Sequence, residues 1–464
     1  MAPVARAYPR QKGARSKMGA FHRGILYPLT LFALGEGKLL SRLREIKRLQ
    51  FDPPASLRAG QESDLARILA HALERVPYYR GLMPRDHGAD GPFERLSRLP
   101  LLAKETVQRE RPRLQATPLP ARYAVKTTGG STGEPVTVLK DRAAAACERA
   151  AMWLGYSWRG ICIGDRAARF WGIPLSRRAG ALRRLGDLVM NRIRFSAFAF
   201  DEEDLGRYWD RCRRFRPAYF HGYVSMLEAV ARYLEDKGID ARGVPSKAIV
   251  ATSEVLSPQQ RALLERVFGV PILIEYGCGE LGPIAYDCEE GMLHTMDFDL
   301  VVEVLRPDGK PATEGESGEV VLTDLRNRAM PLLRYRVGDF AERGGPCPCG
   351  RGLGTLRRIW GREYDFVTSP GGRRFHGEFF MYIFEELRRR GLSIGQFQVV
   401  QKAADRLKVH LVAAPETAAG VQRPLRELLG AEFEGVQIEL ETVPSIPRRS
   451  SGKMAVIVRQ IPSE

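Results

Sequence analysis

A glycine-rich stretch, T-G-G-S-T-G-E-P at Thr128–Pro135, carries the clearest chemistry in the chain. Its glycines let backbone N–H groups turn toward one point, and the hydroxyls of Ser131 and Thr132 add donors there. Such a concavity suits a phosphate group. The stretch is not a Walker loop, because no G-K-[S/T] sequence follows it. A plain turn is the alternative that this stretch leaves open when it is taken alone.

Three thiols and one imidazole form a second group with a recognisable chemistry. Cys288 and His294 are spaced C-x5-H, and Cys347 and Cys349 follow downstream in a C-P-C-G-R turn. Three thiolates and one imidazole complete a tetrahedral structural zinc site, and the neighbouring glycines and prolines favour a tight knuckle. The spacing C-x-C is less diagnostic than C-x-x-C, so isolated loop thiols remain the alternative.

Two carboxylates and one lysine stand where they could meet a ligand. Glu280 follows a strand-like segment and a small-residue turn, and such a side chain often points into a crevice at strand ends. Asp339 ends the stretch Y-R-V-G-D, and an ionised carboxylate accepts hydrogen bonds from a vicinal diol. Lys453 lies in a polar loop that ends S-S-G-K. By composition alone, Asp339 also fits a turn aspartate and Lys453 a solvated tail lysine.

The elements around these residues predict a layered α/β fold. Segments rich in β-branched residues flank the glycine-rich stretch, which indicates two strands joined by a tight loop. From about residue 95, strand-like and helix-like segments alternate, as in an α/β domain. We expect helices at Ala143–Tyr156, Asp204–Arg214, Met226–Lys237 and Pro258–Phe268, and strands at Arg166–Gly172, Tyr219–Tyr223, Lys247–Thr252 and Ile272–Tyr276.

The pattern becomes that of a compact α+β set after G-R-E-Y-D at residues 361–365. Its expected elements include strands at Gln396–Gln401 and Leu407–Ala413 and a helix near Val421–Leu429. We therefore predict a basic helical extension over residues 1–60, a large domain over 61–362, a hinge over 363–365 and a small domain over 366–464. The helix expected at Gln61–Arg80 should end near Pro77.

Composition limits the class of partner. The net charge of +17 over 464 residues suits nucleotides and coenzyme A, and the basic residues do not form one tract with interleaved aromatics, so we expect no nucleic-acid partner. The apolar run Gly24–Leu34 spans 11 residues and cannot cross a bilayer, so no transmembrane segment is expected. Seven cysteines without a regular framework fit a reducing, cytoplasmic location.

Residues 21–50 have helical spacing with a basic face. Packing onto the large domain is the favoured interpretation, and a weak contact with a membrane surface is the alternative. The sequence does not set the oligomeric state, and a homodimer stays open.

Five stretches in one order carry a family resemblance: T-G-G-S-T-G-E-P, Y-G-C-G-E, Y-R-V-G-D, G-R-E-Y-D and S-S-G-K. In this order and at these separations, the sequence resembles the adenylate-forming superfamily. It is most similar to the phenylacetate–coenzyme A ligase branch and its capsule-biosynthesis relatives, from about residue 50 to the end. The motifs V-P-Y-Y-R, H-G-Y-V-S and C-P-C-G-R extend the resemblance.

The resemblance implies roles for individual residues. Glu280 would contact Mg²⁺ bound to ATP, Lys453 would enter the active site during acyl-adenylate formation, and Asp365 would be the hinge residue. Tyr276 would stack on adenine, and Asp339 would bind the ribose with help from Arg362. The full nucleotide set implied is Thr128, Gly130, Ser131, Thr132, Gly133, Tyr276, Gly277, Asp339 and Arg362. The acyl pocket implied is His221, Tyr223, Ser253 and Cys278, with Cys278 replacing a hydroxyl residue of the family.

The implied enzyme is an ATP-dependent ligase that activates a carboxylic acid as acyl-AMP with release of pyrophosphate. The family suggests an aromatic acid and transfer to coenzyme A. An amine, a hydroxyl or a carrier-protein thiol is the alternative acceptor, and a non-catalytic nucleotide-binding protein is the alternative of another class. The expected cofactors are ATP, Mg²⁺ and a structural Zn²⁺.

Overall fold

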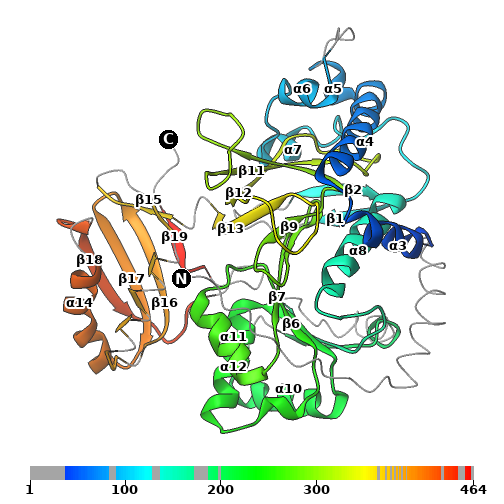
Figure 1. Cartoon of the computed structure of the whole chain (residues 1–464). Coiled ribbons are helices and arrows are strands. Elements are labelled where there is room, and N and C mark those ends of the chain that lie inside the picture. Colours follow the sequence, from blue (N-terminus) through cyan, green and yellow to red (C-terminus); the bar gives the residue numbers. More distant parts are fainter. Residues whose placement is uncertain are drawn as a thin grey trace. The chain divides into compact units, whose positions relative to one another are not determined.

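A computed structural model describes the chain over residues 37–82, 90–127, 136–171, 186–196, 200–362, 366–370, 374–376, 379–380, 383–384, 386–387, 390–392, 394–429, 433–447 and 455–460. The chain divides into two compact units, Met1–Ile359 and Trp360–Glu464. In the first, helices lie on both sides of a large sheet (Figure 1). None of the described helices is both long enough and apolar enough to span a membrane.

The first unit is built on a mixed sheet with the strand order β10-β11-β12-β13-β9-β8-β7-β6-β5-β3-β4. Strands β4, β3, β5, β6 and β7 are parallel. Strand β8 runs antiparallel to both β7 and β9, and β11 runs antiparallel to both β10 and β12. The strand bounds are β3 Ala167–Trp171, β4 Arg192–Ser196, β5 Tyr219–Tyr223, β6 Ala248–Thr252, β7 Ile272–Cys278, β8 Gly282–Asp287, β9 Leu293–Thr295, β10 Leu300–Leu305, β11 Ser317–Asp324, β12 Tyr335–Arg343 and β13 Thr355–Arg362.

Helices cover the parallel part of this sheet on two faces, and each face has its own apolar cluster. Helices α10 (Glu202–Phe215), α11 (Val224–Asp236) and α12 (Pro258–Phe268) pack on one face, with the short 3-10 turn η2 (Ala241–Gly243). Helices α3 (Lys38–Leu49) and α8 (Arg142–Ser157) pack on the other. Leu39, Leu43 and Ile46 of α3 are buried there. The prediction that this basic helix packs onto the large domain is therefore confirmed.

Local capping explains why several element bounds could be predicted. Ser257 caps α12, because its hydroxyl accepts from the Gln260 backbone N–H at 3.2 Å, and Pro258 occupies the first helical position. Gly269 ends the helix with a left-handed φ of 67°. The predicted bounds of α12 are therefore confirmed.

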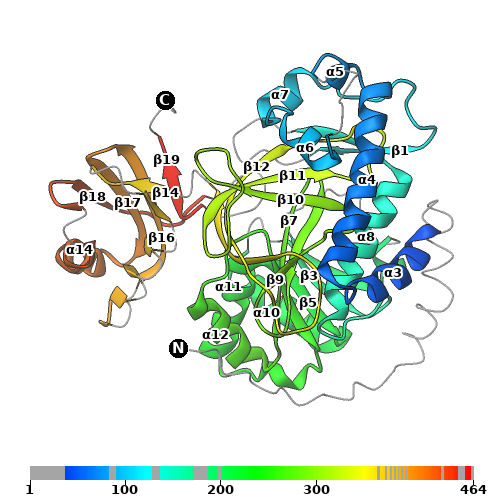
Figure 2. The ribbon, with the colours of Figure 1, turned by 45° about the horizontal axis from the view of Figure 1, so that its top comes forward.

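Helix α4 (Pro54–Arg75) begins earlier than the predicted Gln61, because proline is well tolerated in the first turn of a helix. Helix α4 ends just before Pro77, as predicted, and residues Pro77–Arg80 form the separate short helix α5. Figure 2 shows α3, α4 and α8 on the same side of the first unit. Two further short helices are α6 (Pro92–Ser97) and α7 (Lys104–Arg109).

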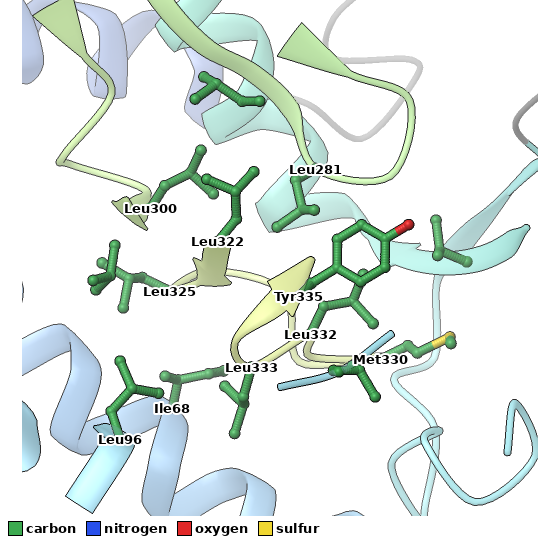
Figure 3. Close-up of a cluster of buried hydrophobic side chains, with 14 of the residues drawn as sticks. Ile68, Leu96, Leu281, Leu300, Leu322, Leu325, Met330, Leu332, Leu333 and Tyr335 are labelled. Carbon is green, nitrogen blue, oxygen red and sulfur yellow. The ribbon is translucent and has the colours of Figure 1, made fainter. Parts of the chain in front are cut away.

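The largest apolar cluster joins α4 and α6 to the antiparallel end of the sheet (Figure 3). Figure 3 shows side chains from distant segments meeting there, among them Ile68, Leu96, Leu281, Leu300, Leu322, Leu325, Met330, Leu332, Leu333 and Tyr335. Because Leu281 and Tyr335 belong to this core, the turn after β7 and the start of β12 are held by burial of apolar surface.

Strands β1 (Tyr123–Thr127) and β2 (Thr137–Asp141) form the predicted hairpin. They pair antiparallel from Tyr123 opposite Asp141 to Thr127 opposite Thr137. The glycine-rich stretch between them lies outside the described residues.

The second unit contains a four-stranded sheet with the order β18-β17-β16-β19. Its elements are β14 Phe366–Thr368, β15 Arg374–His376, β16 Ile394–Ala403, β17 Arg406–Ala413, α14 Pro415–Leu429, β18 Gln437–Thr442 and β19 Ile457–Arg459. The predicted start of α14 at Val421 was too late, since the helix opens on Pro415. Leu425, Leu429, Val399 and Leu411 are buried in one apolar core within this unit.

Candidate active site and metal centre

Tyr276 and Asp339 lie together although three strands separate β7 from β12 in the sheet. The Tyr276 hydroxyl donates to Asp339 Oδ2 at 2.9 Å, and both side chains are buried. This hydrogen bond fixes the ring and the carboxylate relative to each other. An aromatic face and a carboxylate held in this way suit a nucleoside, with its flat base and vicinal hydroxyls.

Glu280 stands on the turn that follows β7. The hydroxyl of Tyr335, a core residue at the start of β12, donates to Glu280 Oε1 at 3.1 Å. Glu280 is partly exposed, so its carboxylate can meet a ligand from solvent. The turn needs glycine at Gly277, because a Cβ there would lie 2.7 Å from the carbonyl oxygen of Gly282. Strand β12 thus positions Glu280 through its first residue and holds Asp339 four residues later.

A partly buried ion cluster against the β1–β2 hairpin was not predicted from the sequence. Glu148 of α8 accepts from Lys126 Nζ at 2.5 and 2.8 Å and from Lys140 Nζ at 2.8 Å. Burial alone would raise the pKa of Glu148, but the two ammonium groups hold it at about 2. The same side chain packs against Gly282, where a Cβ would lie 2.3 Å from Glu148 Cγ.

Glu148 therefore links both strands of the predicted phosphate loop to the turn that carries Glu280. The only sequence signal was one lysine near the end of each strand, Lys126 and Lys140. Lysine side chains in strands are mostly solvated, so the sequence alone could not predict this ion cluster.

His221 and Tyr223 of the predicted acyl pocket come together with Trp171 of β3. The Trp171 ring lies 5.3 Å from the His221 ring and 4.8 Å from that of Tyr223, centroid to centroid. His221 Nε2 is 3.4 Å from Glu275 Oε1, and burial lowers the pKa of His221 so that the ring is neutral near pH 7. The pKa of Glu275 would be raised by burial, yet His221 and two tyrosine hydroxyls hold it at about 2.

The other two predicted pocket residues stand apart from this group. Ser253 follows β6 with a left-handed φ of 70°, and Cys278 ends β7. Within the described ranges, neither shares a hydrogen bond or a ring contact with His221. Burial raises the pKa of the Cys278 thiol, so it is protonated at neutral pH.

Several predicted residues fall where the structure is not described. Among them are Asp365, the expected hinge, and Lys453, the expected catalytic lysine. The loop residues Thr128, Gly130, Ser131, Thr132 and Gly133 also lie outside the described residues. Arg362 is described only as the last backbone position of β13. The roles of these residues stay predictions.

The four predicted zinc ligands converge. Their ligand atoms all lie within 4.8 Å of one another, with Cys288 Sγ 3.6 Å from Cys347 Sγ and Cys349 Sγ 3.1 Å from His294 Nε2. Ligands at Zn–S distances of about 2.3 Å stand about 3.8 Å apart at the corners of a tetrahedron. A disulfide would need about 2.05 Å, so the thiols are spaced for a shared metal ion.

The surroundings of this cluster also fit a metal. Cys288 and His294 are fully buried, and antiparallel strands β8 and β9 bring them to the loop between β12 and β13. Burial lowers the pKa of His294 to about 4, which keeps its imidazole neutral as a ligand must be. Arg351 lies beside the cluster. Its guanidinium carbon is 4.3 Å from the centre of the Trp158 ring, and its Nη1 is 3.1 Å from a carboxylate oxygen of Glu289. The donor set and spacing therefore fit Zn²⁺ better than a hard cation.

Comparison with known proteins agrees with this architecture. The chain is 29% identical to the phenylacetate–coenzyme A ligase of Thermus thermophilus over 351 residues, which cover 69% of this chain and 73% of that protein. It is 25% identical to the protein CapK of Staphylococcus aureus over 343 residues, which cover 72% and 74%. The chain is thus similar in sequence to phenylacetate–coenzyme A ligases and to CapK. Residues 367–460 of the chain match the family model of the CapK C-terminal domain.

A solved structure shows the same fold over most of the chain. The 2-hydroxyisobutyryl-CoA ligase in its postadenylation state aligns with a TM-score of 0.70 at 19% identity, covering 89% of this chain and 91% of that protein. The expected fold, a large α/β domain followed by a small α+β domain of the adenylate-forming type, is confirmed.

Proposed function

We propose that the protein activates a carboxylic acid with ATP and transfers the acyl group to coenzyme A. In the first step a carboxylate oxygen of the acid bonds to the α-phosphorus of ATP. The bond from this phosphorus to the oxygen that bridges the α- and β-phosphates breaks, and pyrophosphate leaves with its electron pair. In the second step the coenzyme A thiolate bonds to the acyl carbon, and AMP leaves. The observation that carries the proposal is the pairing of Tyr276 with Asp339 beside the Glu280 turn, in a chain similar in sequence to phenylacetate–coenzyme A ligases.

The described residues support the first step in distinct ways. Tyr276 would stack on adenine, and Asp339 would accept hydrogen bonds from the ribose hydroxyls. Glu280 offers a partly exposed carboxylate, the hard oxygen ligand that suits Mg²⁺. Bound with ATP, this ion would neutralise phosphate charge. Glu148, through Lys126 and Lys140, would keep the hairpin of the phosphate loop next to the Glu280 turn.

We also propose that Cys288, His294, Cys347 and Cys349 hold a structural Zn²⁺. Four protein ligands complete the tetrahedron and leave no position for a substrate, so the ion would stabilise the β8–β9 and β12–β13 connections and take no part in the reaction.

A different acyl acceptor is the second candidate. The similarity to CapK favours it, because residues 367–460 match the CapK C-terminal domain and the name of that relative does not include coenzyme A. The acceptor would then be an amine, a hydroxyl or a carrier-protein thiol, with the adenylation step unchanged.

The test is ATP–pyrophosphate exchange with a panel of aryl and alkyl acids, followed by mass analysis of products formed with coenzyme A. We expect acid-dependent exchange and a thioester product. Exchange without a thioester would favour another acceptor. No exchange with any acid, together with no thermal stabilisation by MgATP, would refute the adenylation proposal.

A further inference from the structure

Three neighbouring parallel strands present basic side chains in one row. Arg194 of β4 is paired with Arg169 of β3, which is paired with His221 of β5. Residues paired in register point to the same face of a sheet, so the three side chains share the face that packs toward α8. Two residues nearer the carboxyl ends of the strands, the rings of Trp171 and Tyr223 lie 4.8 Å apart, centroid to centroid, and both pack against the apolar cluster of α10, α11 and α12.

Positive charge exceeds negative charge in this row. Asp187 Oδ1 accepts from Arg192 Nε and from Arg194 Nε, each at 2.7 Å, so one carboxylate serves two guanidinium groups. Glu275 is engaged by His221 and by the Tyr286 hydroxyl at 3.0 Å. Arg169 pairs with no carboxylate among the described residues, and its Nε is buried without a hydrogen-bond partner.

Arg169 is held in place by Trp171, with the guanidinium carbon 4.1 Å from the ring centre. Burial lowers the pKa of this guanidinium, and Arg192 and Arg194 act in the same direction, whereas Tyr156 and Glu275 act against it. Keeping a cation out of water without a directly paired anion is costly. The residue as a whole is partly exposed although its Nε is buried, so an anion from solution would meet the exposed part of the guanidinium.

The topology places this row where open α/β sheets bind ligands. The chain passes from β3 to β4 on one side and from β5 to β6 on the other, while β3 and β5 are adjacent in the sheet. The strand order therefore reverses between β3 and β5. Ligands bind outside the carboxyl ends of strands at such a reversal. Trp171 and Tyr223 are the last residues of the two strands, and Arg169 and His221 stand two residues earlier.

We propose that Arg169, with His221 beside it, binds a second anionic group on the acid substrate, and that the partly exposed Trp171 packs against its aromatic ring. The substrate class is thus an aromatic acid with an additional carboxylate or similar anion, rather than a neutral arylacetate. This inference rests on the proposed function, because it assumes that the acid occupies the crevice next to β7.

Binding measured by calorimetry without ATP tests the inference apart from catalysis. The probes are 3- and 4-carboxyphenylacetate, each compared with its neutral isostere 3- or 4-nitrophenylacetate. We expect at least one dicarboxylate to bind the wild-type protein about 10- to 100-fold more tightly than its nitro isostere, the range for a hydrogen-bonded charge pair. Arg169→Met should remove this preference, and Arg169→Lys should restore part of it.

Arg213→Met, on the exposed face of α10, is the matched control and should leave binding unchanged. Equal binding of the nitro and carboxy compounds, absence of binding by all four, or an unchanged preference in Arg169→Met would each overturn the inference. Selective binding of a dicarboxylate without ATP–pyrophosphate exchange would support the anion site and count against the adenylation proposal. A circular dichroism spectrum like that of the wild type establishes that each variant is folded.

Discussion

Glutamine in place of Glu148 removes the charge that neutralises a buried lysine. The Lys140 side chain is 2% exposed, whereas that of Lys126 is 33% exposed and can turn toward water. Breaking a buried ion pair by removing one partner typically costs about 3–5 kcal/mol, because the other charge stays buried without compensation. We therefore expect Glu148→Gln to lower the free energy of unfolding of the first unit by this amount at pH 7.

The pKa of Glu148 gives an independent magnitude. In the folded protein it is about 2, against 4.5 for an ordinary glutamate, so the unfolded chain takes up the proton at the higher pH. The stabilisation is therefore fully present above pH 4.5 and is lost as the pH falls toward 2. At about 1.4 kcal/mol for each pH unit, this interval corresponds to about 3 kcal/mol. The two magnitudes agree, and Glu148→Gln should lack this part of the acid dependence.

Urea unfolding followed by tryptophan fluorescence measures the effect, since four of the five tryptophans belong to the first unit: Trp153, Trp158, Trp171 and Trp209. Glu203→Gln, which breaks an exposed pair with Arg207, is the matched control and should change stability by less than about 0.5 kcal/mol. The double variant Lys140→Met with Glu148→Leu should recover most of the loss, because apolar residues can replace a buried pair. A loss in Glu148→Gln no larger than that of the control would refute the reasoning.

Three further predictions concern the metal and the nucleotide. Cys347→Ser should lower both the zinc content and the melting temperature, whereas Cys162→Ser, at an exposed position, should change neither. Elemental analysis measures the zinc content. Wild-type protein that contains no zinc after purification without chelator would contradict this prediction. Tyr276→Phe keeps the ring but loses the hydrogen bond to Asp339, so ATP binding should weaken by about tenfold, the value of one hydrogen bond to a charged group; an unchanged dissociation constant in calorimetry would count against the nucleotide assignment. Lys453→Ala should slow acyl-AMP formation by about 10²–10³ and spare acyl transfer from supplied acyl-AMP, which separate half-reaction assays would measure; equal loss of both steps would indicate a folding defect.

The sequence predicted helices and strands well where their bounds depend on neighbouring residues. The β-branched residues of Tyr123–Thr127 and Thr137–Asp141 formed the expected hairpin, and the caps of α12 set both of its ends. The predicted starts of α4 and α14 were too late. Each helix begins at a proline, and proline was taken as a residue that interrupts a helix. A proline costs little in the first turn, where its missing N–H has no partner inside the helix.

By itself, the sequence determined the types and order of the site residues, and through their order the resemblance to adenylate-forming ligases. It also supplied the four candidate metal ligands as two pairs, C-x5-H and C-x-C, each of which has a local spacing. Tertiary structure alone decided that Tyr276 bonds Asp339 across three intervening strands, that Lys140 is buried against Glu148, and that Arg169 lies beside His221. Strand order and burial set these contacts, and both depend on how distant segments pack, which no short window of residues encodes.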